Sequence, residues 1–397
     1  MARYDLIVIG GGLAGAALAR AMAAGGARVL VLEPELRFRD RVRGEGMHPW
    51  GVAEARALGL DVSLVTACAR EVRFWTTHRG SDLLRRRDLV ETSPHRAGEM
   101  TFYHPAMQEH LLGLAADAGA EVRRGVTVTA LAPGPIPSVL ADARGGSETL
   151  EARLVVAADG RQSRAREWGG FRTRREPRWL AITGVLLEGG KVPADTISVF
   201  RLPVFGQTVL LFPLDEARCR AYFCTGRRTE HGWLSGEGNL AQFIALTVGT
   251  GAPAEWFSGA RPAGPLATFE AADHWVDGPY RDGVVLVGDA AAASDPCFGC
   301  GLSLTLRDVR VLRDRLLGLA DWDAAARQYA AEHDAYYGAL RTAIAWLRTV
   351  LYGLGPDADR IREHAMPQLA RGLGPDVIGV GPDCAVDEAA RVQFLGR

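Results

Sequence analysis

Lysine is nearly absent from this chain of 397 residues, because Lys191 is the only one and arginine supplies the other basic side chains. The 46 basic and 47 acidic residues leave a formal charge of −1. That balance gives no reason to expect nucleic acid or an anionic membrane as a partner. Six cysteines are few for this length, so a disulfide-rich secreted scaffold is not expected.

Long uncharged apolar runs are also missing. None reaches the length that spans a membrane, so stable membrane insertion is not expected. The N-terminus lacks the regions of a signal peptide, and its first apolar run is predicted to be a strand. We therefore expect a cytoplasmic protein. Cysteine and histidine pairs with zinc spacing are lacking too, so no metal is expected.

A glycine-rich turn near the N-terminus is the first positive signal. A β-branched run leads directly into Gly10, Gly12 and Gly15, and an Ala-rich helix follows. This order is typical of a dinucleotide-binding strand, turn and helix. Gly10 permits the turn, Gly12 lets the backbone approach a pyrophosphate, and Gly15 allows close packing of helix on strand. The N–H groups of the helix start, at Leu13 and Ala14, would face the phosphate.

The second predicted strand, 28–32, ends at Glu33. Such folds place an acid about 20 residues beyond the glycines, where it accepts hydrogen bonds from a ribose 2′-OH. An unphosphorylated adenosine ribose is therefore favoured. The turn and the acid do not distinguish NAD from FAD.

Two later apolar strands resemble the first one. Residues 154–158 lead into Asp159 and Gly160, and residues 283–287 lead into Gly288 and Asp289. We expect both strands in the same parallel sheet, with a ligand at their carboxyl ends. The strands predicted between them have no helical crossovers, which indicates an antiparallel sheet and a second domain. Those strands are 179–187, 196–202, 208–214 and 220–224.

The other segments give simpler expectations. We predict one strand at 71–76, irregular structure at 81–98, a helix at 105–119 and a helix at about 302–319. Residues 323–354 are predicted to be largely helical, and the last forty residues form a mixed tail.

The three motifs together resemble the single-component FAD-dependent aromatic hydroxylases, the para-hydroxybenzoate hydroxylase-like group. The resemblance covers most of residues 1–320 in order. It implies an α/β fold with a Rossmann-like FAD-binding domain, an inserted and mostly antiparallel β-sheet substrate domain, and a C-terminal helical region. The expected limits are 1–70, 101–168 and 266–320 for the FAD-binding domain, 71–100 and 169–265 for the substrate domain, and 321–397 for the helical region.

The resemblance also implies roles for particular residues in holding FAD. Asp289 would bind ribityl hydroxyls, as would Gln108. Asp159 and Gly160 would touch FAD and the place where NAD(P)H docks, and Arg43 would contact a cofactor phosphate. The family usually has arginine at the position of His104, so this chain departs from the pattern there.

The segment 295–301 resembles the Pro-x-x-Gly-x-Gly loop that lies under the isoalloxazine ring in this family. The corresponding residues are Pro296, Gly299 and Gly301, with Leu302 next in the chain. Backbone N–H groups at this helix start would stabilise negative charge on the flavin during reduction.

The activity implied is that of a monooxygenase. A hydride from NAD(P)H reduces FAD, and O₂ then forms a flavin C4a-hydroperoxide that hydroxylates or epoxidises an organic substrate, aromatic or polyketide-like. The absence of a second glycine fingerprint fits NAD(P)H as a transient co-substrate. It equally fits a partner reductase that supplies reduced flavin.

Other functions remain compatible with the same FAD-binding fold. Gly44, Glu45 and Pro49 resemble a segment of flavin-dependent halogenases, but the only lysine, Lys191, lies in the second domain and no Trp-x-Trp occurs. A flavin dehydrogenase or reductase of geranylgeranyl-reductase type is a further alternative. The non-enzymatic alternative is an escort-like binding protein.

Three sets of side chains remain ambiguous. His48 is a general base, an orienting donor, a covalent flavin tether or a structural residue. Cys297 and Cys300 form either a redox pair with lowered pKa or two small buried residues. Substrate contacts are expected from the second sheet, although its parity is undetermined. The candidates are Trp179, Thr183, Phe200, Arg201, Phe212 and Tyr222.

Overall fold

A computed structural model describes residues 4–42, 44–177, 180–202, 206–226 and 234–396. Its first large sheet has the order β20-β21-β11-β1-β2-β8, and β10 and β9 extend it beside β11. The pairs β1–β2, β1–β11, β11–β21 and β2–β8 are parallel, as expected for the three apolar strands. The strands are β1 (Tyr4–Ile9), β2 (Val29–Glu33), β8 (Glu121–Arg124), β9 (Thr127–Ala132), β10 (Ser138–Ala143), β11 (Gly146–Ala157), β20 (Tyr280–Arg281) and β21 (Val284–Leu286).

Helices cover one face of this sheet, where α1 (Leu13–Ala24) packs against α5 (His104–Asp117) and α8 (Gly301–Gly318). Side chains alternate between the two faces of a strand, so the first sheet has a hydrophobic core on each face. Leu6 and Val8 point into the cluster formed with these helices, whereas Ile7 and Ile9 point to the side of β9 and β10. The carboxyl ends of β1, β11 and β21 therefore lie at the same edge of the sheet, where α1 begins.

The second large sheet has the order β17-β13-β16-β15-β14-β5-β6, with β18 also on β13. It is antiparallel except for the pair β5–β14, which confirms the mostly antiparallel prediction. The strands are β5 (Phe74–Arg79), β6 (Asp82–Asp88), β13 (Leu180–Glu188), β14 (Thr196–Leu202), β15 (Gln207–Pro213), β16 (Arg218–Gly226), β17 (Arg261–Pro262) and β18 (Ala267–Ala271).

Two local predictions are wrong. Residues 71–76 belong to two strands, β4 (Ala69–Val72) and β5, and residues 81–98 contain β6 and α4 (Leu89–Thr92) instead of irregular structure. The exposed arginines of β6 hide the alternation that marks a strand, because β6 lies at the edge of the sheet and, in the described part of the chain, pairs only with β5.

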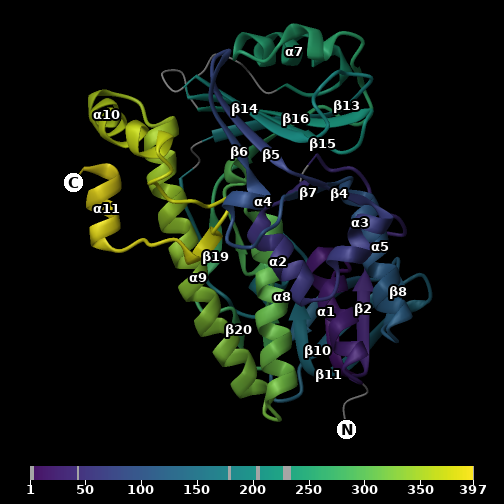
Figure 1. The fold of residues 1–397 in the computed structure, drawn as a ribbon. Coiled ribbons are helices and arrows are strands. Elements are labelled where there is room, and N and C mark those ends of the chain that lie inside the picture. Colours follow the sequence, from purple (N-terminus) through teal and green to yellow (C-terminus); the bar gives the residue numbers. More distant parts are fainter. Residues whose placement is uncertain (1–3, 43, 178–179, 203–205, 227–233, 397) are drawn as a thin grey trace.

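Each face of the second sheet has its own core. Val185 and Phe223 pack under α7 (Leu240–Gly249), on what we call the outer face. Ile182 and Tyr222 belong to the cluster that includes Phe298 and the C-terminal helices, on what we call the inner face. In Figure 1, α7 lies above this sheet and α8 and α9 lie below it.

Smaller elements join the two large sheets. Two three-stranded sheets have the orders β3-β7-β4 and β12-β19-β22. The remaining elements are β3 (Gly46–Met47), β7 (Glu99–Phe102), β12 (Thr173–Arg175), β19 (His274–Val276), β22 (Ala292–Ala293), α2 (Pro49–Ala57), α3 (Asp61–Ala67) and α6 (Ala165–Trp168).

The C-terminal part is helical, as predicted for residues 323–354, and the tail adds two more helices. These are α9 (Trp322–Tyr352), α10 (Pro356–Ala370) and α11 (Glu388–Leu395). Asp321 caps α9 by accepting a 3.0 Å hydrogen bond from the N–H of Ala324. Among the described residues, no helix combines the length and apolarity needed to cross a bilayer.

Candidate functional site

The glycine-rich turn is closed by two contacts that exclude side chains. Gly10 has φ +97°, and a Cβ there would lie 2.6 Å from the carbonyl oxygen of Ala158, at the end of β11. A Cβ on Gly15 would lie 1.9 Å from the carbonyl oxygen of Gly10. Both positions therefore require glycine, and the turn is drawn tightly between β1, β11 and α1.

Gly12 differs from these two because the space above it is open. A Cβ there would meet only Nε2 of Gln108, at 3.4 Å. Gly12 is the N-cap of α1 and no side chain caps the helix, so the first N–H groups, at Leu13 and Ala14, lie at an uncapped positive end. This combination forms a cradle suited to phosphate.

Glu33 stands beside the turn at the end of β2. Its Oε2 accepts a 2.7 Å hydrogen bond from the N–H of Gly11, and its Oε1 accepts one of 2.8 Å from the N–H of Glu35. The residue is only 5% exposed. Burial raises the pKa of this carboxyl, although the Gly11 N–H opposes the shift. The sequence prediction placed an acid here, and the contacts fix its orientation.

Asp159 lies at the end of β11, directly across the turn. Its Oδ2 accepts hydrogen bonds from the N–H groups of Arg164 (3.0 Å) and Ala165 (3.3 Å), which cap the short helix α6. Its Oδ1 is buried and has no hydrogen-bond partner among the described residues. Burial raises the pKa of Asp159. Gly160 follows with φ +79°, which favours glycine.

Arg166 ties the second motif to the third. Its Nε donates to the carbonyl oxygen of Ala290 at 2.7 Å, and its Nη2 donates to the carbonyl oxygen of Asp289. Sequence reasoning missed this residue, because nothing local distinguishes it from the other arginines around it.

The Gly288-Asp289 motif also touches the glycine turn. A Cβ on Gly288 would lie 3.3 Å from the Cβ of Ala14, so α1 and this motif are in contact. The N–H of Gly288 donates to Oδ2 of Asp308 at 2.7 Å, and Tyr336 donates to the other oxygen at 2.6 Å. Asp308 was not predicted, since it lies within the apolar repeat of α8.

The loop 295–301 leads into α8. Asp295 accepts a 2.9 Å hydrogen bond from the N–H of Cys297, and its own N–H donates to Asp273 at 2.6 Å. Gly299 has φ +68°, and no side chain caps the start of α8 at Gly301. Burial, together with the neighbouring Asp295, raises the pKa of Asp273 to about 7.

This loop is adjacent to the segment after residue 43. A Cβ on Gly44 would approach Leu302 to 3.4 Å and Nδ1 of His104 to 2.9 Å. The Nδ1 of His104 lies 2.7 Å from the carbonyl oxygen of Gly44 and donates a hydrogen bond to it. The predicted contact of Arg43 lies outside the described residues, as does Trp179.

The inner face of the second sheet lies opposite the loop. Arg201, Phe212 and Tyr222 are on that face, in register with the inner-face cluster. Nε of Arg201 is buried without a partner among the described residues. Phe212 contacts Tyr222 edge-on, with ring centroids 6.2 Å apart.

Thr183 and Phe200, two of the substrate candidates, lie on the outer face of the second sheet. Thr183 shares the parity of Val185, and its hydroxyl lies 2.7 Å from the hydroxyl of Thr268. Phe200 packs in the outer core and contacts Trp256 edge-on. Both side chains therefore point away from the loop, because successive residues of a strand face opposite sides.

A buried ionic cluster joins the two sheets. Arg220 is fully buried on β16, and its guanidinium contacts Asp40 at 2.7 Å and Glu45 at 3.1 Å. Tyr222 donates to the other oxygen of Glu45. Burial raises the pKa of Glu45 to about 7, although Arg220 and Tyr222 oppose that shift. Glu45 belongs to the segment that resembles halogenases, but no local feature of the sequence distinguishes Arg220 from the other arginines.

The cysteines do not support a redox pair with lowered pKa. Both Cys297 and Cys300 are buried, and all six cysteines are free. Burial raises the pKa of Cys297 well above its usual value, whereas the redox alternative requires a lowered pKa. Within the described ranges, no group of three or more His, Cys, Asp or Glu could hold a metal ion.

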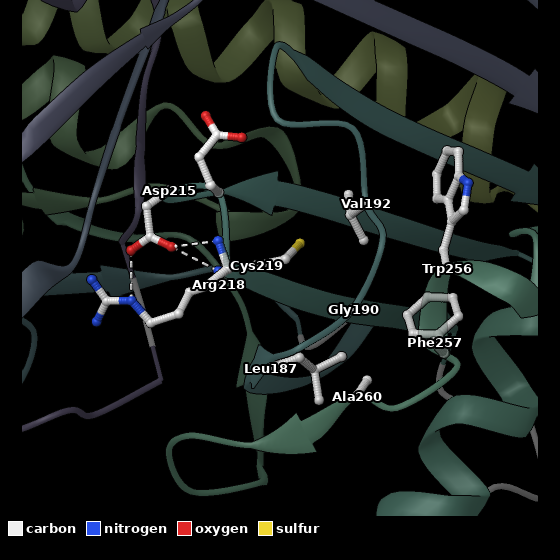
Figure 2. A pocket seen from close by; sticks show the side chains of 11 residues that line it. Leu187, Gly190, Val192, Asp215, Arg218, Cys219, Trp256, Phe257 and Ala260 are labelled. Atoms are coloured by element: carbon white, nitrogen blue, oxygen red, sulfur yellow. Dashed lines mark hydrogen bonds and ion pairs between the residues drawn. The ribbon is translucent and has the colours of Figure 1, made fainter.

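Two cavities lie away from these motifs. Figure 2 shows a hollow between Leu187, Arg218 and Trp256, with a volume of about 10 Å³. That is room for about one water molecule. A larger cavity of about 290 Å³ lies among the C-terminal helices, beside Trp346 and Phe394. Neither cavity is lined by a residue of the three motifs.

The parallel sheet, its glycine turn and the acid at the end of β2 define a dinucleotide-binding flavoprotein fold. Residues 3–336 match the FAD binding domain family, and the chain belongs to that family. The choice of FAD over NAD, which the turn alone left open, is thereby confirmed.

Relatives and solved structures agree with this assignment. The chain is 27% identical over 370 residues to ubiquinone hydroxylase UbiL of Rhodospirillum rubrum, covering 83% of this chain and 77% of the relative. It is 26% identical to squalene epoxidase 2 of Arabidopsis thaliana, covering 79% of this chain and 54% of that relative. p-Nitrophenol 4-monooxygenase PnpA of Pseudomonas putida superimposes with a TM-score of 0.79 at 18% identity, over 94% of both chains. The predicted resemblance to FAD-dependent hydroxylases is confirmed for family and fold.

Proposed function

We propose that this protein is an FAD-dependent monooxygenase that uses NAD(P)H and O₂ to hydroxylate or epoxidise an organic substrate. The observation that carries the proposal is the meeting of three distant motifs. The turn at Gly12, the loop after Asp159 and the Gly288-Asp289 motif converge on the starts of α1 and α8, opposite the inner face of a separate sheet.

The residues present fit FAD. The space above Gly12 is a cradle that a Cβ would enter, and α1 and α8 both begin without a side-chain cap. The buried Oδ1 of Asp159 has no partner among the described residues, as expected for an acceptor that faces a ligand. The residues that would hold FAD are Gly10, Gly12, Leu13, Ala14, Gly15, Glu33, Arg43, Gln108, Asp159, Gly160, Gly288, Asp289, Gly301 and Leu302.

FAD supplies, when bound, hydride acceptance from NAD(P)H and activation of O₂ for oxygen transfer. The residues of this chain would bind and orient the cofactor, and they would exclude water from it. The backbone of Pro296, Gly299 and Gly301 presents the positive start of α8, which stabilises negative charge on a neighbouring group. Glu33 and the turn at Gly12 would hold the adenosine and pyrophosphate end of the cofactor, and the loop 295–301 would hold the other end.

The substrate would lie between the loop 295–301 and the inner face of the second sheet. Arg201, Phe212 and Tyr222 offer a cation, an aromatic ring and a phenol on that face. In this proposal, FAD is bound by residues 1–70, 101–168 and 266–320. The substrate is bound by residues 71–100 and 169–265, and residues 321–397 brace these two parts. Placement in the cytoplasm is also proposed, on the support of six free cysteines.

The names of the relatives suggest a sizeable apolar substrate, because ubiquinone hydroxylase and squalene epoxidases are among them. Another relative, digeranylgeranylglycerophospholipid reductase of Methanocella arvoryzae, is 26% identical over 335 residues and favours a reductase as the second candidate. Halogenation is not favoured, because Lys191 is exposed and its N–H donates to the carbonyl oxygen of Trp256 at the outer face.

Isotope labelling separates these functions. FAD-loaded protein is incubated with NADH or NADPH and ¹⁸O₂ in the presence of phenolic, quinone and polyprenyl compounds, and products are analysed by mass. One ¹⁸O atom in a product supports the proposal. Reduction of a polyprenyl double bond without oxygen would overturn it in favour of the reductase. A reductase domain added in a parallel arm tests whether reduced flavin must be supplied by a partner.

A further inference from the structure

His48 has a hydrogen-bond acceptor at each ring nitrogen. Nδ1 lies 2.8 Å from Oε2 of Glu99, and Nε2 lies 2.7 Å from the carbonyl oxygen of Phe298. A neutral imidazole has one N–H and donates once, whereas an imidazolium donates twice. We propose that His48 is a permanently charged imidazolium that positions the loop 295–301 and raises the reduction potential of the flavin bound there. This inference rests on the proposed function only in requiring bound FAD.

The surroundings favour the charged form. Glu99 and His48 are both fully buried, and in a contact pair the proton belongs on imidazole, which is the stronger base by about two pKa units. Burial disfavours the cation, but the carboxylate of Glu99 and the thiol of Cys300 together more than offset this and raise the pKa of His48 well above its usual value. Without the carboxylate of Glu99, burial would favour the neutral imidazole, so the positive charge depends on this pair.

The groups that face His48 come from three elements. Glu99 belongs to β7, Cys300 and Ser303 belong to the start of α8, and the ring of Trp75 on β5 lies 6.0 Å away. Among these, Glu99 is the acid in contact with the ring. The charge therefore has one buried counter-ion among these groups.

Three contacts fasten His48 to the loop and to α8. Besides the bond to Phe298, the N–H of His48 donates to the hydroxyl of Ser303 at 3.0 Å. A Cβ on Gly299 would lie 3.1 Å from the imidazole ring, so the loop and the ring are in van der Waals contact. The positive charge of His48 therefore lies against the loop that would support the flavin.

This arrangement decides between the roles that the sequence left open. An imidazolium has no lone pair, and both nitrogens already donate, so His48 is neither a general base nor a covalent tether. It is a positioning residue that also contributes a fixed positive charge. A fixed positive charge stabilises the anionic reduced form of a neighbouring group over its neutral oxidised form.

The charge itself is tested by ¹⁵N NMR of the imidazole of His48 between pH 6 and 9, in apoprotein and with FAD. We expect two protonated nitrogens throughout. One protonated nitrogen at pH 7, the signature of a neutral histidine beside a neutral Glu99, would overturn the proposal even if no variant folds.

The effect on flavin is tested by dye-equilibrated potentials of Glu99→Gln and His48→Gln, without substrate or O₂. Both variants should show a lower midpoint potential, equivalent to about a tenfold loss in preference for reduced over oxidised FAD. Thr101→Val is the matched control, because it removes a buried 2.6 Å hydrogen bond from the same strand without changing charge. Potentials unchanged in both glutamine variants, or lowered equally in the control, would overturn the proposal. Because no oxygen transfer is measured, failure of the proposed function would leave these results intact.

Discussion

The Oε2 of Glu33 accepts a 2.7 Å hydrogen bond from the N–H of Gly11, so the acid at the end of β2 and the glycine turn form one unit. The same carboxylate also accepts from Glu35. Glu33 therefore orders the turn, and under the proposed function it would also accept a hydrogen bond from a ribose hydroxyl.

Glu33→Gln should weaken FAD binding by about tenfold, because a glutamine amide has one acceptor oxygen and leaves one of the two N–H groups unpaired. Fluorescence titration of apoprotein with FAD measures the effect. Glu35→Gln is the control, since only the backbone of that residue touches the site. Equal affinities of Glu33→Gln and wild type would show that the acid plays no part in binding.

Gly12→Ala should fold normally yet lose at least about tenfold in FAD affinity. Its Cβ would meet only Gln108, at 3.4 Å, but would enter the phosphate cradle. Gly113→Ala is the matched control, because it lies in α5 with nothing within 4 Å of its Cβ. That control should be more stable by about 0.5–1 kcal/mol and bind FAD normally. Melting curves and FAD titrations check both, and retained affinity in Gly12→Ala would contradict the cradle.

Glu45 should make stability depend on pH. Its pKa rises from 4.5 in the unfolded chain to about 7 in the folded one, so the folded state binds the extra proton between these values. Stability due to this group is therefore greatest below pH 4.5 and falls as pH rises to 7, by about 3 kcal/mol. Urea unfolding of wild type and Glu45→Gln at pH 5 and 8 isolates this contribution. A difference between the two proteins that is the same at both pH values would contradict the prediction.

Arg220→Met should destabilise the protein by about 3–5 kcal/mol, because it leaves Asp40 and Glu45 as buried acids without their cation. The double variant with Asp40→Asn should recover part of the loss. Chemical unfolding measures both changes. A single variant as stable as wild type would mean that the cluster adds nothing to the union of the two sheets.

The features predicted from sequence are those with local signals. Gly10, Gly12 and Gly15 follow a β-branched strand, and Asp159 and Asp289 each end an apolar run, so spacing and pattern placed them. Distant pairings had no such signal. Asp308 holds Gly288 from 20 residues away, and Glu99 holds His48 across 51 residues.

Two properties of the sequence explain the predictions that fail. The face of a strand residue cannot be assigned without the sheet register, and arginine is too common in this chain to single out a buried one. Thr183 is a substrate candidate in the sequence, which leaves the parity of the sheet undetermined, and the register puts its side chain on the outer face, because a shift of one residue reverses every such choice. Arg166 and Arg220 carry structural roles in a chain where arginine is common, so residue type alone did not distinguish them. Their burial became evident only from the packing of distant strands.

The central claim is that the turn at Gly12 and Glu33 anchor the adenosine and pyrophosphate of FAD, while the loop 295–301 supports the ring. The most direct measurement is an equilibrium titration of apoprotein with FAD and, separately, with FMN, which lacks the adenosine half. We predict one FAD per chain, bound at least about 100-fold more tightly than FMN, or about 2.7 kcal/mol. Equal affinities for FAD and FMN, or no FAD binding, would contradict the account.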